Sequence, residues 1–233
     1  MIYHEINQLI VINFFSRTLQ MNKGFSLLEM TFVLLALSFL LSGLLSPLSA
    51  RMTQFQIRQT NEQLQQTIDA LIGFAILQNR LPCPDTSGGD GREDTANCDS
   101  EGDLPWADLG VNGKDKWNRM LRYRVQKNFT TAITATTTPC ATTATCQFKI
   151  QRKDGTRLTV FTGDSNVIAV VFSRGKNHEG DSENANGDRI YTMDDLFEDT
   201  DKISPDNTFD DQMKWLSKNE LFYRMVTANS IYP

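Results

Sequence analysis

The chain lacks the short motifs that carry common enzyme chemistry. It contains no His-Glu-x-x-His, no Gly-x-Ser-x-Gly and no phosphate loop ending in Lys-Ser or Lys-Thr, and it has only two histidines in 233 residues. Adjacent acids occur at Asp194-Asp195 and Asp210-Asp211, but such pairs in polar segments usually lie in solvent or cap helices. These absences predict that the protein is not an enzyme.

Cysteine is also scarce, and its placement argues against a zinc site. The four cysteines, Cys83, Cys98, Cys140 and Cys146, form no Cys-x-x-Cys pair, and the one histidine in the second half of the chain is His178. An even number of cysteines after an apolar segment is typical of an oxidising compartment. Three pairings are possible, and short loops favour Cys83 with Cys98 and Cys140 with Cys146.

Charge is missing altogether from residues 30–50, which are followed by Arg51. From Gly24 to Ala50 the only charged residue is Glu29. A helix needs about 20 apolar residues to cross a bilayer, so residues 25–50 are predicted to form a transmembrane helix. A carboxylate inside such a segment costs about 2.5 to 3.5 kcal/mol at mid-bilayer and less near the interface. Glu29 is therefore either a snorkelling residue of an ordinary anchor or a functional residue.

The residues around Glu29 favour a functional role. The string Gly24-Phe25-Ser26-Leu27-Leu28-Glu29 resembles the processing site of type IV pilins and type II secretion pseudopilins. The resemblance implies that a prepilin peptidase cuts after Gly24 and methylates Phe25. It also implies that Glu29 pairs with the terminal amine of a neighbouring subunit during assembly. Burying a carboxylate together with an ammonium in an apolar setting costs less free energy than burying the two charges separately.

The same resemblance implies a location and a set of partners. Residues 1–24 would be the leader, and Met21 would be the true start of a short leader if residues 1–20 are not translated. The protein would be a single-pass protein of the bacterial inner membrane with its C-terminal domain in the periplasm, later assembled into a pilus or pseudopilus. Its partners would be other pilin or pseudopilin subunits, the prepilin peptidase and the inner-membrane assembly platform.

The predicted fold is α+β: a long N-terminal helix, membrane-embedded in its first half, packed on a small antiparallel sheet with disulfide-closed loops and a C-terminal helix. Apolar residues at helical spacing predict that the helix continues through residues 51–80, and residues 81–233 form the globular head. Residues 121–125, 147–151, 157–161 and 167–172 are predicted strands of one antiparallel sheet. Residues 208–228 are predicted to form one or two helices, with Thr208 and Asp211 as a capping box.

A Gly/Asp/Asn-rich segment after the fourth predicted strand offers oxygen ligands. Calcium takes six to eight oxygens. The candidate ligands are Asp181, Glu183, Asn184, Asn186 and Asp188. The spacing is not that of an EF-hand, although the segment loosely resembles the calcium loop of major pseudopilins. The alternative is a plain solvated loop, and no other cofactor is expected.

The function predicted from these features is that of a structural subunit of a pilus-like fibre, either a pseudopilin or a minor type IV pilin. The alternative is a fibre-tip adhesin or a DNA-uptake pilin. A net charge of -5 argues against nucleic-acid binding. One group of cations could nevertheless meet phosphates: Lys114, Lys116, Arg119, Arg122, Arg124 and Lys127. The other interpretation of this group is a mixed, solvated surface.

Overall fold

The structure is a computed structural model that describes residues 26–139, 148–152, 155–158, 167–177, 184, 189–193 and 211–231, without the side chains of residues 43–50. The chain forms two compact units, Met1–Met52 and Thr53–Pro233, which are described separately below. We call the second unit the head.

Helix α2, Leu27–Gln78, is the longest element, with 52 residues. Its part within the head buries an apolar stripe in which Leu64, Ile68, Leu71 and Ala75 recur every three or four residues. The helix ends at Asn79, which has a left-handed φ of 55° and so stops the helical hydrogen-bond pattern. This stripe supplies one side of the head's main core.

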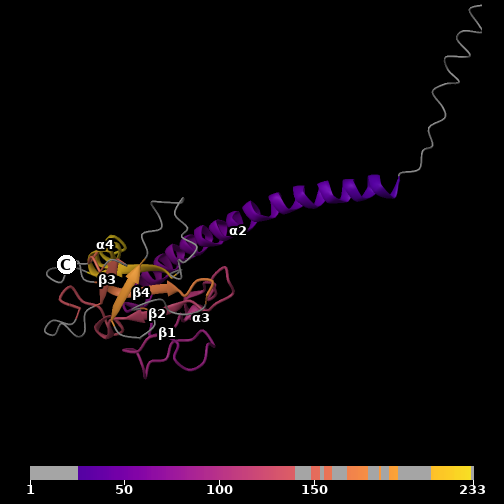
Figure 1. Cartoon of the computed structure of the whole chain (residues 1–233). Coiled ribbons are helices and arrows are strands. Elements are labelled where there is room, and N and C mark those ends of the chain that lie inside the picture. Colours follow the sequence, from indigo (N-terminus) through magenta and orange to yellow (C-terminus); the bar gives the residue numbers. More distant parts are fainter. Residues whose placement is uncertain are drawn as a thin grey trace, which may run out of the picture. The chain divides into compact units, whose positions relative to one another are not determined.

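A four-stranded antiparallel sheet forms the centre of the head (Figure 1). Its strand order is β1 (Gly102–Asp103), β2 (Arg122–Val125), β4 (Val167–Ser173) and β6 (Gln212–Ser217). Strand β4 is buried along its whole length because both of its faces are covered. Ala169 and Val171 belong to the core shared with α2, whereas Val170 and Phe172 belong to a second core.

The second core lies against a separate sheet of two parallel strands, β3 (Lys149–Arg152) and β5 (Ile190–Met193). Phe148, Ile150 and Tyr191 from this sheet region pack against the main sheet. The Tyr191 ring lies 6.0 Å from the Phe148 ring and 5.6 Å from the Phe172 ring, between ring centroids. Such edge and tilted aromatic contacts add to the stability gained from burial alone.

Helix α4, Lys218–Thr227, follows β6 directly. Ser217 caps it, because the Ser217 hydroxyl accepts a hydrogen bond from the Glu220 backbone N–H at 3.2 Å. Leu221 and Met225 bury its inner face in the main core. Two short elements complete the described fold: α3, Trp106–Leu109, and the 3-10 helix η2, Lys127–Phe129.

The predicted α+β class, small antiparallel sheet and C-terminal helix are confirmed, but the membrane-embedded first half of the N-terminal helix is wrong. Within the described residues, no helix combines the length and the apolar character that crossing a bilayer requires.

Of the predicted strand 157–161, only residues 157–158 are described; Arg157 forms an antiparallel bridge with Gln151, and the Leu158 N–H donates to the Ile150 carbonyl at 2.9 Å. Two details of the predicted sheet and C-terminal region are wrong. Residues 149–152 pair in parallel with β5 rather than joining the antiparallel sheet. Residues 212–217 are strand β6 and not helix, so the C-terminal helix begins at Lys218.

Candidate functional site

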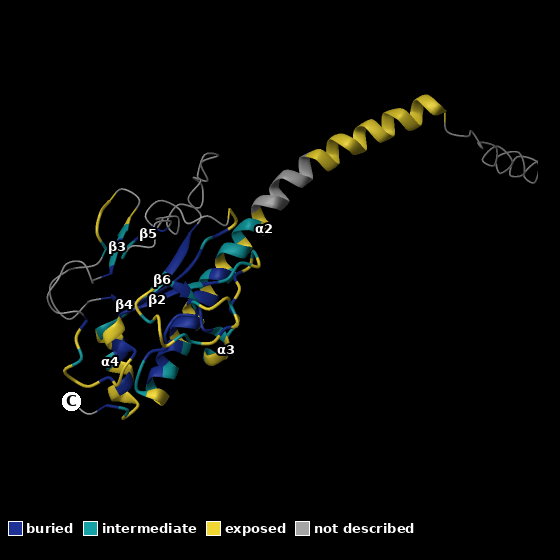
Figure 2. Ribbon diagram, turned by 90° about the horizontal axis from the view of Figure 1, so that it is seen from below, coloured by how far each residue is buried: buried dark blue, intermediate teal, exposed yellow. Residues whose placement is uncertain are grey.

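The first part of α2 exposes an almost wholly apolar surface. Among its described side chains, large apolar groups are exposed from Leu27, at 88%, to Leu41, at 59%. Figure 2 shows this stretch as exposed, whereas the helix within the head carries buried and half-buried residues. The exposed set is Leu27, Leu28, Met30, Phe32, Val33, Leu34, Leu35, Leu37, Phe39, Leu40 and Leu41. An apolar surface of this extent is typical of an interaction site.

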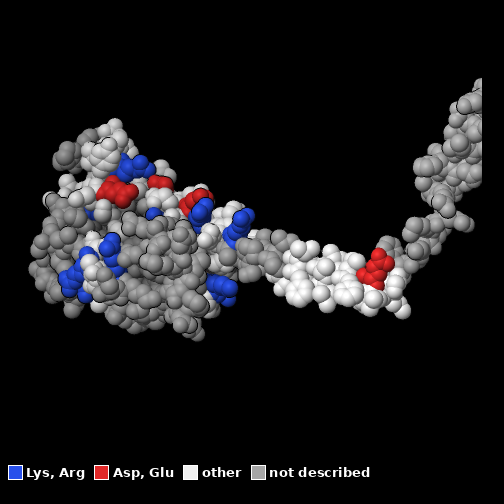
Figure 3. Space-filling model, turned by 45° about the horizontal axis from the view of Figure 1, so that its top comes forward, with Lys and Arg blue, Asp and Glu red and all other residues white. Residues whose placement is uncertain are grey.

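Two of the hydroxyl groups in this stretch are hydrogen-bonded to the helix backbone. Thr31 donates its Oγ1 hydrogen to the Leu28 carbonyl at 2.7 Å, and Ser38 donates its hydroxyl to the Leu34 carbonyl at 2.8 Å. Both groups are thus satisfied by the helix's own backbone. Glu29 is left as the one charged residue of residues 26–42, and Figure 3 shows a single acidic patch on this otherwise uncharged surface.

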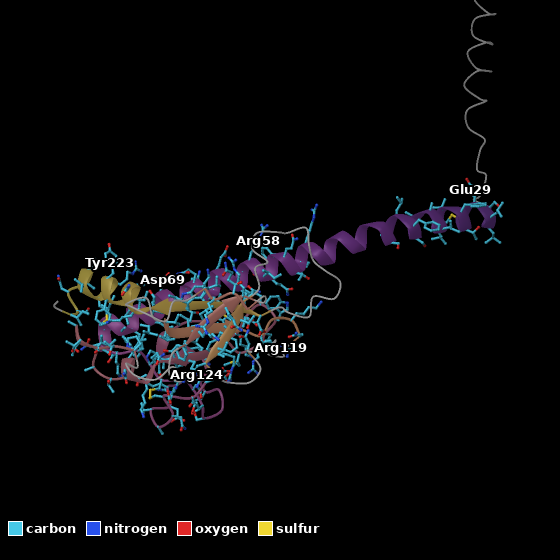
Figure 4. The ribbon with its side chains drawn as sticks, turned by 60° about the vertical axis from the view of Figure 1, so that its left-hand side comes forward. Glu29, Arg58, Asp69, Arg119, Arg124 and Tyr223 are labelled. Carbon is cyan, nitrogen blue, oxygen red and sulfur yellow. A yellow bond between two sulfur atoms is a disulfide. The ribbon has the colours of Figure 1, made fainter. Side chains whose placement is uncertain are left out.

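Glu29 lies in the first turn of α2, and its side chain is labelled in Figure 4. The positive end of the helix dipole favours a carboxylate at this position by a few tenths to about 1 kcal/mol. Among the described residues, none forms a hydrogen bond or an ion pair with the Glu29 side chain. The two predicted processing residues, Gly24 and Phe25, lie outside the described residues.

The exposed apolar surface represents a large free energy that is available for association. Burying one Leu, Phe or Met side chain contributes about 1.5 to 3 kcal/mol. Eleven large side chains are exposed on residues 27–42, so complete burial would contribute on the order of 15 to 30 kcal/mol, an upper estimate. This exceeds the rough 4 to 15 kcal/mol that association costs in lost freedom of motion.

The head contains the predicted disulfide between Cys83 and Cys98, which closes a loop with a sequence separation of 15. The base of this loop is also held by charge, because Arg80 Nη2 lies 2.5 Å from Glu93 Oε1. The hydrogen bond from Arg80 and a second one from the Cys83 N–H hold the pKa of the Glu93 carboxyl below its usual range, although burial opposes this. Cys140 and Cys146 lie outside the described residues.

Within this loop, Asp85 organises the backbone. Its carboxylate accepts hydrogen bonds from the N–H groups of Ser87 at 3.1 Å and Gly91 at 2.8 Å. Burial raises the pKa of the Asp85 carboxyl, but these hydrogen bonds outweigh that effect and leave the pKa below its usual value. The loop is therefore fixed by a disulfide, an ion pair and a buried carboxylate.

Only one of the five predicted calcium ligands, Asn184, lies in the described part of the chain, and it is 1% exposed. Its amide donates to the Thr192 carbonyl at 2.8 Å and to Asp211 Oδ2 at 2.9 Å, and its oxygen accepts from the Thr192 N–H at 2.9 Å. Asn184 thus ties its segment to strand β5. Asp181, Glu183, Asn186 and Asp188 lie outside the described residues, and no cluster of three metal-binding side chains occurs among the described ones.

Two members of the predicted basic group, Arg122 and Arg124, are engaged within the head, whereas Lys114, Lys116 and Lys127 are exposed. Arg122 pairs with Asp103 at 2.6 Å and with Glu101 at 3.3 Å. Arg124, labelled in Figure 4, is only 8% exposed. Guanidinium groups that already meet carboxylates or lie buried offer little to a phosphate.

The acidic residue that joins this network, Glu101, was not among the residues predicted from the sequence. The Glu101 side chain is 8% exposed and lies between Arg122 and Arg174, with the Arg174 Nη2 atom at 3.6 Å. Tyr191 of β5 donates its hydroxyl to Glu101 at 3.5 Å, and burial raises the pKa of that hydroxyl far above its usual value. Glu101 therefore links the region of β1 to the parallel sheet. Its signal in the sequence is the alternation of charges on two strands that pair, with Asp103 opposite Arg122.

Comparisons with known proteins add no assignment: no family model, no curated protein and no solved structure matches this chain.

Proposed function

We propose that this chain is a structural subunit of a pilus-like fibre, a pseudopilin of type II secretion or a minor type IV pilin. A prepilin peptidase would process it between Gly24 and Phe25. The observation that carries the proposal is the helix that follows this bond. It exposes apolar side chains over residues 27–42, and Glu29 is their only charged neighbour.

The proposed mechanism is assembly through this helix. Copies of the helix pack side by side, which removes the exposed apolar side chains from water and drives association. Cleavage frees an ammonium group at Phe25, and the Glu29 carboxylate of a neighbouring copy pairs with it. Because an unpaired charge in an apolar interior is costly, this pair selects one axial register between copies.

The head would then face outward from the fibre. Its Cys83–Cys98 disulfide supports a location in an oxidising compartment such as the periplasm, since disulfides rarely persist in the cytosol. The ion pairs of Arg122 and the burial of Arg124 weigh against a DNA-uptake role, because they engage two of the six cations of the predicted basic group within the head. The assembly role is therefore the one that we carry forward.

Deletion of the gene in its own bacterium tests this proposal. An assembly subunit is expected to abolish fibres, or secretion of folded substrates, and re-expression of the wild-type chain should restore them. The matched comparison is re-expression of a chain with Glu29→Gln. This variant keeps the size of the side chain and loses its charge, so it should not restore assembly to the wild-type level. Normal fibres and normal secretion in the deletion strain, together with loss of ligand binding, would instead identify a tip adhesin.

A further inference from the structure

The charged residues at the two ends of the apolar part of α2 have opposite signs. Glu29 precedes the uncharged residues 30–50, and Arg51 is the first charged residue after them. Both side chains are exposed and both belong to the unit Met1–Met52. Among the described residues, no carboxylate pairs with Arg51. Each end of the apolar stretch thus presents one charge without a described partner.

The helical geometry places these two charges on one side of the helix. Arg51 follows Glu29 by 22 positions in the continuous helix α2. At 1.5 Å and 100° per residue, this separation corresponds to about 33 Å along the axis and a rotation of only about 40°. Glu29 and Arg51 of one copy are therefore too far apart to meet, although they point in similar directions.

We propose that Glu29 of one copy pairs with Arg51 of a second copy displaced by about 33 Å along the fibre axis. This inference rests on the proposed fibre function. If the side of α2 that carries both residues faces the fibre axis, the acid of one copy and the cation of another converge there at this displacement. The apolar stretch of one copy then begins where that of the other ends, and the fibre interior stays apolar between the charges.

Other registers are less favourable for electrostatic reasons. With no displacement, the Glu29 side chains of neighbouring copies would lie at the same height and repel one another in a medium that screens poorly. Intermediate displacements place Glu29 beside the uncharged residues 30–50 of the other copy. A carboxylate has two oxygens and can accept from more than one donor, so Arg51 can share Glu29 with a terminal ammonium.

A charge exchange tests this pairing in the intact protein within its assembly machinery. The variants are Glu29→Arg, Arg51→Glu and the double variant, with Glu29→Arg/Arg58→Glu as the matched control. Each single variant is expected to lower the yield of sheared fibres at least tenfold. The double variant should give more fibres than Glu29→Arg alone but fewer than the wild type, because Arg at position 29 also repels the Phe25 ammonium, and the control should give no more than Glu29→Arg. Normal assembly of Arg51→Glu, or rescue by the Arg58 control instead, would overturn the inference.

Cysteine cross-linking supplies a second measurement that does not depend on rescue. Chains carrying Glu29→Cys are co-expressed with chains carrying Arg51→Cys, and the control population carries Arg58→Cys. A disulfide-linked dimer is expected from the first mixture and not from the control, provided that fibres form. Fibres without this dimer contradict the Arg51 pairing and leave the proposed function standing. A wild-type chain that never assembles contradicts the proposed function and the pairing with it.

Discussion

The Trp106 side chain packs closely against two glycines, Gly91 and Gly113. The substitution Gly113→Ala therefore tests how much this close packing contributes to the stability of the head. A Cβ atom on Gly113 would overlap the Cδ1, Cγ and Cβ atoms of Trp106. A Cβ atom on Gly91 would overlap the Cε2, Nε1 and Cδ2 atoms of the same indole. The backbone of Gly113 cannot retreat easily, because its carbonyl accepts a hydrogen bond from the Leu121 N–H at 2.8 Å. The indole would have to move, and it packs against the main core.

The expected cost follows from this geometry. Extra volume in a packed site typically costs about 1 to 3 kcal/mol. We therefore expect Gly113→Ala to lower the free energy of unfolding of the head by about that amount. The matched control is Gly73→Ala. No atom lies within 4 Å of a Cβ at Gly73, which is within helix α2, and alanine there should stabilise the helix by up to about 1 kcal/mol.

Urea unfolding of residues 53–233, followed by tryptophan fluorescence, measures both effects. The two glycine variants should shift the midpoint in opposite directions with unchanged slopes. If Gly113→Ala matched the wild type within about 0.5 kcal/mol, a typical scatter for surface changes, the close packing of Trp106 against Gly113 would be refuted.

Three further predictions concern the head. Cys98→Ser should destabilise it by about 3 kcal/mol, the loop-closure value for about 15 residues, and calorimetry of Cys83→Ser, which removes the same disulfide, should give the same loss. Ser217→Ala should cost about 1 kcal/mol in urea unfolding, because the Glu220 N–H loses its cap, whereas Ser217→Asp should retain stability. The folded state lowers the pKa of Asp85, so its contribution is complete above pH ~4 and is lost as the pH falls below that value. Asp85→Asn should make the free energy of unfolding depend less steeply on pH below ~4. An unchanged slope in urea unfolding across this pH range would contradict the assigned role of Asp85.

Part of the fold could be predicted because its signals are local. Residues 167–172 are a short continuous apolar run, and the structure buries β4 on both faces. Residues 212–217 were predicted to be helical because Met213, Trp215 and Leu216 fit a helical face as well as an alternating strand. The pairing of Ser173 with Gln212 across the sheet decided between the two. A strand partner so far along the chain leaves no local pattern in the sequence from which it could be predicted.

The parallel pair of β3 and β5 illustrates the same limit. Lys149 pairs with Ile190, far along the chain, and each strand has only four residues. A two-stranded sheet is at best marginally stable by itself. The aromatic contacts of Tyr191, which help to hold this one, depend on the tertiary fold. The buried position of Glu101 escaped prediction for the same reason. Glu29 and the cysteines could be identified from the sequence because a lone charge in an apolar segment, or a thiol, is recognisable without knowledge of the tertiary structure.

We propose that the mature chain begins at Phe25, and the mass of its N-terminal peptide measures where it begins. The protein is isolated from its own bacterium as the wild type and as Gly24→Ala, and both are digested and analysed by mass spectrometry. We expect an N-methylated Phe25 terminus in the wild type and its loss in the variant. A wild-type peptide that extends intact across Gly24 and Phe25, without methylation, would contradict it.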